Sequence, residues 1–174
     1  MTGKNQRKSK DSGQERGPRR EEKEYDQQII DIARVTRVMA GGKRMRFRAC
    51  VVVGNRQGKI GTAMAKGADV TLAVNKAVTK AKNNIMTVPI VNETIPHRVD
   101  IKYGAAKILI KPAPKGTGII AGGAVRVILD LAGVSNAVAK ILGTNNKINN
   151  VKATFEALRR LKRAEGKKQE NIKT

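Results

Sequence analysis

The pattern with the most chemistry in this sequence is a row of arginines at alternate positions. Arg44, Arg46 and Arg48 are separated by single residues. Alternate residues of a β-strand point to the same side, so the three guanidinium groups would face one way. No acidic residue occurs between positions 32 and 68, and like charges on one sheet face are costly without a counter-anion. The row therefore predicts contact with phosphates, whose neutralisation dominates nucleic-acid affinity.

A β-hairpin is the element that would hold this row. Residues 29–35 are rich in β-branched side chains, and the Gly41-Gly42 pair after them can supply the positive φ angles of a two-residue hairpin turn. On the returning strand the arginines alternate with Met45, Phe47 and Ala49, so the opposite face can pack on a core. A glycine turn also lets the backbone approach a nucleic acid closely.

The composition favours folded RNA as the polyanion. The net charge is +22, and +14 of it falls in residues 25–158, so the excess lies in the part that looks folded. Aromatic residues, on which single-strand binders stack bases, make up only 2% of the chain. Folded RNA is instead recognised by its backbone and shape, and no zinc-finger spacing or zipper heptad supports DNA. The residues predicted to contact RNA are Arg34, Arg37, Gly41, Gly42, Lys43, Arg44, Arg46, Arg48, Arg56 and Lys66.

A glycine-rich run at residues 116–123 invites a nucleotide-binding interpretation. Gly118 and Gly123 have the spacing of a phosphate loop, but Ala124 follows where that loop needs Lys and then Ser or Thr. A dinucleotide site would follow a strand directly, whereas residues 111–115 read Lys-Pro-Ala-Pro-Lys. A tight backbone path at an interface explains the run better, and a nucleotide-dependent enzyme remains the alternative.

The sequence contains few residues that could support catalysis, metal binding or membrane insertion. His97 is the only histidine, and the acidic residues are too scattered to indicate a carboxylate pair or a metal site. Cys50 lies in the apolar run 49–53, which predicts a buried thiol. No stretch approaches the ~18 apolar residues of a membrane span, and no signal peptide is visible. We expect a non-enzymatic, cytoplasmic protein without cofactor, metal or membrane contact; an organellar location stays open.

The chain divides into a basic arm, two folded units and a basic tail. Residues 1–24 lack apolar periodicity and are expected to be disordered in isolation. Residues 25–88 form one predicted unit, residues 89–162 a second, and residues 163–174 the tail. The predicted class is α+β with two small α/β domains.

The elements of the two units follow from periodicity. The first is predicted as β-β-β-α over roughly 28–85, with a helix that Asp69 opens. An extended segment near Ile85 starts the strand pattern of the second unit. Gly133 is a natural helix stop. The second unit is predicted to contain strands at 98–101 and 106–110, helices at 124–132 and 149–162, and a segment at 134–142 that fits either state.

Several segments resemble the universal fifth protein of the small ribosomal subunit, of the bacterial type. They are residues 38–44 (VMAGGKR), 51–55 (VVVGN) and 112–126 (PAPKGTGIIAGGAVR), with agreement also at 130–134 and 143–146. They occur in order across both predicted units, and the Ala-Gly-Gly-Ala-x-Arg ending is highly specific to that family. Lys147 departs from it, because a proline is common there.

The resemblance implies a fold, a function and partners. The fold is a double-stranded-RNA-binding-like domain followed by a two-layer α/β domain with a left-handed β-α-β crossover. The function is that of a structural constituent that binds small-subunit ribosomal RNA, shapes the junction of head and body and the path by which messenger RNA enters, and supports translational accuracy. The implied protein partners are the fourth and eighth small-subunit proteins, with the third nearby. The implied protein-interface residues are Lys115, Gly116, Gly118, Gly122, Gly123 and Arg126.

A second functional interpretation is compatible with the same charge and fold. A free RNA-binding regulator would have an equally basic body, and only its absence from small-subunit particles would distinguish it. Sedimentation of a cell extract separates the two interpretations.

Overall fold

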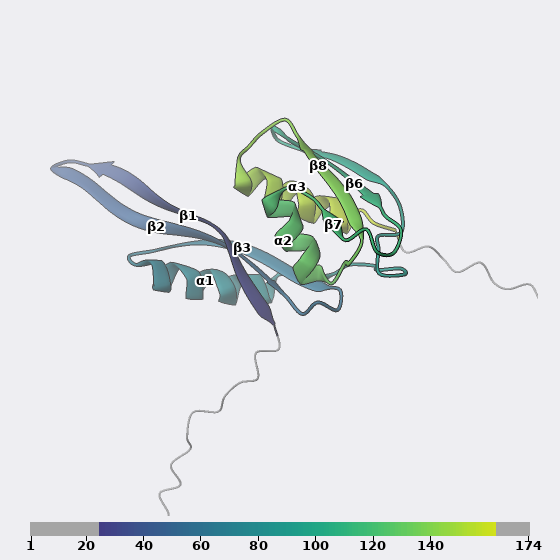
Figure 1. The fold of residues 1–174 in the computed structure, drawn as a ribbon. Helices are drawn as coiled ribbons and strands as arrows, with labels where there is room; N and C mark the ends of the chain where they lie inside the picture. Colours follow the sequence, from purple (N-terminus) through teal and green to yellow (C-terminus); the bar gives the residue numbers. More distant parts are fainter. Residues whose placement is uncertain (1–24, 163–174) are drawn as a thin grey trace, which may run out of the picture.

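The computed structural model describes residues 25–162, which form two four-stranded sheets and three helices (Figure 1). The predicted arm and tail lie outside the described residues. The first sheet contains β1 (Asp26–Met39), β2 (Gly42–Gly54), β3 (Lys59–Gly67) and β4 (Ile85–Thr87), antiparallel and in that order. The second contains β5 (Val99–Tyr103), β6 (Ala106–Pro112), β8 (Ala137–Leu142) and β7 (Ile119–Ile120), in that spatial order. The helices are α1 (Val70–Asn83), α2 (Gly123–Ala132) and α3 (Lys147–Arg159).

The elements stack in four layers (Figure 1). Helix α1 covers one face of the first sheet, and α2 and α3 lie between the two sheets. A small core joins α1 to the first sheet, and a larger core joins the other face of that sheet to α2, α3 and the second sheet. The alanines of α1 and Gly61 of β3 allow close approach, since a Cβ at Gly61 would lie 2.3 Å from the Ala81 carbonyl oxygen.

The turn between β2 and β3 docks onto the end of α2. The backbone N–H of Arg56 donates to the Leu131 carbonyl (3.0 Å), and that of Gly58 donates to the Ala132 carbonyl (2.8 Å). These bonds satisfy carbonyls that the helix end leaves free. The approach requires Gly54, because a Cβ there would lie 2.2 Å from the Leu131 oxygen. The two sheets therefore belong to one packed body.

Much of the predicted local structure is confirmed. The hairpin, the mixed α+β class and the two-part organisation are present. Asp69 opens α1 by accepting a hydrogen bond from the Val70 N–H. The Thr71 hydroxyl, and then the Val70 N–H, hold the pKa of Asp69 below its ordinary value. Gly133 ends α2 in the left-handed conformation, with φ +86°.

Two expectations about the elements were wrong, and a third segment, which the sequence left open, is now assigned. The segment from Ile85 belongs to the first sheet as β4, because it pairs with β3 rather than with the second unit. The ambiguous segment 134–142 contains a strand, β8. Helix α3 begins and ends earlier than predicted, because the Asn146 side chain accepts the Ile148 N–H and sets its start. None of the helices within residues 25–162 is long and apolar enough to cross a membrane.

Candidate nucleic-acid interface

The pairing register of β1 and β2, which one β-bulge interrupts, decides which cations of the hairpin share a face. Ile29 lies opposite Val51 and Asp31 lies opposite Cys50, so Ile30 is an extra residue in the ladder. Such a residue shifts the alternation of side chains by one position. Beyond the bulge, odd-numbered residues of β1 therefore share a face with even-numbered residues of β2.

Five predicted cations lie on that face, which we call the cationic face: the half-buried Arg48, and the four exposed residues Arg37, Arg44, Arg46 and Lys66. Arg37 lies directly opposite Arg44, and Lys66 of β3 lies opposite the neighbouring Arg48. All four are exposed, and no carboxylate within residues 25–162 comes within ion-pair distance of them. They border a groove of about 270 Å³ whose lining is Val35, Thr36, Arg37, Met39, Arg44, Arg46 and Lys66.

Two predicted cations lie on the opposite face of the hairpin. Arg34 is opposite Phe47 and Lys43 is opposite Val38, on the side of the sheet that α1 covers further along. The sequence suggested a single cluster around the arginine row. The structure divides it in two, because Arg34 and Arg37 are three residues apart on one strand and therefore point to opposite sides.

Arg48 lies on the cationic face but has an acidic partner. Its guanidinium is 3.8 Å from the Asp31 carboxylate, which also lies 3.4 Å from the ammonium of Lys147 at the start of α3. Asp31 faces this side because it lies opposite Cys50, and both of its partners are distant from it in the sequence. The three charges join the base of the hairpin to the second half of the molecule.

The hairpin turn is displaced by one residue from its predicted place. Met39 pairs with Gly42, so the two turn residues are Ala40 and Gly41, while Gly42 already belongs to β2. Both glycines have positive φ, and a Cβ at either would meet no atom within 4 Å. Backbone conformation rather than space therefore requires them. Val38, near the projecting tip, is 74% exposed.

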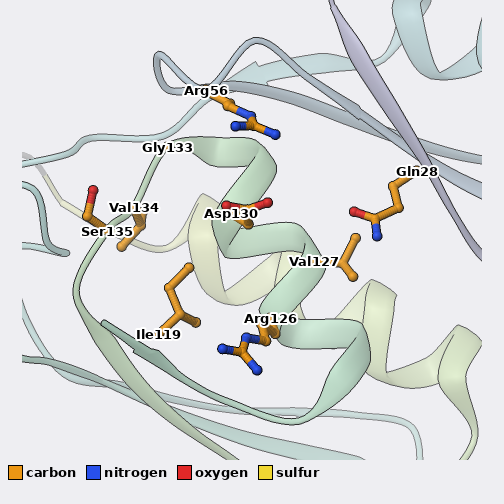
Figure 2. Close-up of a pocket in the computed structure, with 9 residues that line it drawn as sticks. All are labelled: Gln28, Arg56, Ile119, Arg126, Val127, Asp130, Gly133, Val134 and Ser135. Atoms are coloured by element: carbon orange, nitrogen blue, oxygen red, sulfur yellow. The ribbon is translucent and has the colours of Figure 1, made fainter. Parts of the chain in front are cut away.

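Arg56 lies at the opposite end of β2 from this turn. It forms an ion pair with Asp26 at 3.1 Å. It also borders a cleft of about 670 Å³ between β1, α2 and β7, in which Figure 2 shows Asp130 between Arg56 and Arg126. The structure thus brings Arg56 close to the predicted protein interface and away from the cationic face. The lining residues are Gln28, Arg56, Ile119, Arg126, Val127, Asp130, Gly133, Val134 and Ser135.

The glycine-rich loop is held by one buried amide. The Asn136 side-chain oxygen accepts the N–H groups of Gly116 and Gly118, each at 3.1 Å, and Asn136 is only 4% exposed. Both glycines have positive φ, +90° and +72°. Gly122 lies close to Ile141, where a Cβ would come within 2.8 Å of its Cδ1, whereas Gly123 has open space.

This geometry leaves Lys115 and Arg126 exposed beside a fixed backbone. Sequence reasoning missed Asn136, because a single asparagine in an ambiguous segment gives no signal of its role.

Side chains that could bind a metal do not cluster in the part of the chain that the structure describes. Within residues 25–162, no group of three or more His, Cys, Asp or Glu side chains could hold a metal ion. His97 accepts the Lys162 N–H at Nε2 and contacts the Arg98 carbonyl through Nδ1, so it fastens the chain after α3. Cys50 is buried as predicted, and burial raises the pKa of its thiol.

Fold and site define a class: a two-domain α+β protein that presents a cationic hairpin on a packed body. The family model described as "Ribosomal protein S5, N-terminal domain" matches residues 25–89. The model described as "Ribosomal protein S5, C-terminal domain" matches residues 101–171. The chain belongs to the ribosomal protein S5 family. It is therefore a non-enzymatic, structural constituent of the small ribosomal subunit, as the resemblance implied.

Two relatives illustrate the similarity. "Small ribosomal subunit protein uS5c" of Emiliania huxleyi is 45% identical over 140 residues, which cover 80% of this chain and 88% of that protein. The protein of the same name from Spinacia oleracea is 48% identical over 139 residues. That match covers 79% of this chain and 45% of the spinach protein, so the chain spans less than half of that relative.

Proposed function

We propose that the chain binds small-subunit ribosomal RNA through the cationic face of its hairpin. The observation that carries the proposal is the grouping of Arg37, Arg44, Arg46 and Lys66 on one exposed face without a carboxylate partner in the described residues. Such a grouping is stable when a polyanion supplies the missing charge. The proposal also includes the other predicted residues of the hairpin: Gly41 and Gly42 at the tip, Arg48 on the same face, and Arg34 and Lys43 on the opposite face.

The proposed mechanism is electrostatic and geometric. A guanidinium donates two parallel hydrogen bonds to a phosphate, and each neutralised phosphate releases condensed counterions. Among the described residues no helix covers the cationic face of the projecting half, and the base of the hairpin is packed between α1 and α2 (Figure 1). The hairpin can therefore reach RNA without losing the orientation that its base imposes.

A filter-binding titration with small-subunit ribosomal RNA at several salt concentrations tests this proposal. Arg44→Ala with Arg46→Ala should weaken binding and lower the slope of log K against log salt by about 2, roughly one per removed cation. Arg159→Ala with Arg160→Ala is the matched control, because it removes the same charge from the exposed end of α3. Equal slopes for both double variants would contradict the assignment.

We also propose a place for the chain within the subunit. The family resemblance supports a position at the junction of head and body, along the path by which messenger RNA enters and near the third small-subunit protein. The Asn136-held loop and Arg126 would face the fourth protein, and the second domain would contact the eighth. We keep residues 25–88 and 89–162 as the proposed domain limits.

Decoding accuracy provides the test of the loop assignment. Arg126→Glu, in small subunits that carry this chain, should raise stop-codon readthrough in a reporter, because it disturbs the contact beside the loop. RNA binding by the purified variant should keep the wild-type salt slope. Unchanged readthrough would remove Arg126 from the interface.

A further inference from the structure

The segment that joins the two sheets contains a tight turn. Val91 and Thr94 exchange two backbone hydrogen bonds, of 2.9 and 3.0 Å, so Asn92 and Glu93 are the two turn residues. Both have positive φ, +50° and +64°, as in a type I′ turn. Glutamate rarely adopts this conformation, so contacts with the rest of the protein must hold the turn in place.

The contacts that hold the turn lead to Asn136. The Glu93 carbonyl accepts the backbone N–H of Asn136 at 3.1 Å. The Thr94 hydroxyl donates to the Asn136 carbonyl at 2.5 Å. The turn therefore binds both backbone polar groups of the residue whose side chain holds the glycine-rich loop.

The Thr94 hydroxyl also reaches the chain that leads into the loop. It accepts the backbone N–H of Ala113 at 3.3 Å. The next residue, Pro114, begins the loop, and its carbonyl accepts both the N–H (3.3 Å) and the hydroxyl (2.9 Å) of Thr117. Thr94 is half-buried and Ala113 is buried. One hydroxyl thus joins the chain before the loop to the residue that holds the loop from behind.

We propose that Thr94 is a positioning residue for the glycine-rich loop, and that the turn at residues 91–94 influences decoding accuracy from outside the protein interface. The inference rests on the proposed role of the loop at the fourth protein. Thr94 acts through another residue, since the amide oxygen of Asn136 makes the contacts with Gly116 and Gly118. Both loop bonds end on that one oxygen, so a displacement of Asn136 disturbs them together.

A general stabilising role for Thr94 would predict a different pattern of effects. The junction of the two sheets has its own hydrogen bonds, from Arg56 to the Leu131 carbonyl and from Gly58 to the Ala132 carbonyl. Thr94 takes part in neither of them. Loss of its hydroxyl should therefore loosen the loop while the junction keeps its protection from hydrogen exchange.

Amide hydrogen exchange of the purified protein, followed by NMR, tests the positioning role. Thr94→Val removes the hydroxyl at nearly constant shape, so the Gly116 and Gly118 amides should exchange about threefold to tenfold faster, the factor expected for one lost hydrogen bond. Thr94→Ser keeps the hydroxyl and should restore the wild-type rates. The Gly58 amide is the internal control. Unchanged exchange at both loop glycines, or equal acceleration at Gly58, would overturn the proposal.

Stop-codon readthrough in small subunits that carry this chain tests the effect on accuracy. Thr94→Val should raise readthrough, as Arg126→Glu should, and Thr94→Ser should leave it at the wild-type level. If Arg126→Glu alone raises readthrough, the turn has no influence on accuracy and the proposal is wrong. If neither variant does so while the loop amides exchange faster, the positioning role stands and the proposed role of the loop in accuracy fails.

Urea unfolding of each variant shows whether it folds. Thr94→Ala removes the same hydroxyl and provides the same two measurements if the valine variant does not fold.

Discussion

The two halves of β2 differ sharply although they belong to one continuous strand. Residues 42–48 are exposed or half-buried and carry the arginine row, whereas residues 49–54 are buried between α1 and α2. The even positions of the strand include Arg44 and Arg46 in the projecting half, and Cys50 and Val52 in the buried half. The same alternation therefore serves binding where the strand is uncovered and core formation where helices cover it. We expect substitutions in the projecting half to change RNA affinity, and substitutions in the buried half to change the free energy of unfolding.

The largest effect is expected in the buried half, from Gly54→Ala. The new Cβ would lie 2.2 Å from the Leu131 carbonyl oxygen, so α2 must move away from the first sheet. Overpacking of this kind costs about 1–3 kcal/mol, which urea unfolding would measure. Gly123→Ala is the matched control, because a Cβ there meets nothing within 4 Å. Equal unfolding midpoints for the two variants would show that the close contact is unimportant.

The projecting half should respond to Arg44→Lys with Arg46→Lys in affinity alone. The charge is kept, so the salt slope should stay near that of the wild type, while loss of bidentate geometry weakens RNA binding by about threefold to tenfold. The urea midpoint should not move, since both residues are exposed. Wild-type affinity in filter binding would mean that net charge alone matters on this face.

The reactivity of the Cys50 thiol measures how often the buried half of β2 becomes exposed. The thiol is 2% exposed, so alkylation should proceed only through unfolding and should be faster in Gly54→Ala. Burial raises the pKa of this thiol above the ordinary value of 9.0. The stability that the neutral thiol contributes is present below pH 9.0 and declines as pH rises from there toward the folded-state pKa. A rate of alkylation that matches a free thiol at neutral pH would contradict this burial.

The smallest effect is expected at the boundary of the two halves, from Lys147→Pro. Proline is accepted at the first position of a helix, so α3 should persist while the 3.4 Å contact with Asp31 is lost. A partly exposed ion pair contributes at most about 1 kcal/mol, so the unfolding midpoint should shift only slightly. A large shift would assign this contact a principal role in joining the two sheets.

The sequence predicted those features that depend on residues close together in the chain. The arginine alternation, the buried run after it, Asp69 at the start of α1 and Gly133 at the end of α2 all depend on near neighbours in the chain. The bulge at Ile30, the pairing of β4 and the role of Asn136 depend on partners far away in sequence. The sequence therefore predicted the alternating row of the hairpin, but not the contacts between residues that are distant in the chain.

The alternation of side chains along the paired strands β1 and β2 also limits how the hairpin can change in length. Each added pair of facing residues, one per strand, reverses the side on which every more distant side chain emerges. Only an even number of such steps keeps Arg37, Arg44 and Arg46 on their present side. Relatives that retain this surface should therefore differ in hairpin length by multiples of two residues per strand. Such changes keep the charged side chains on the same side of the hairpin while altering their distance from the body.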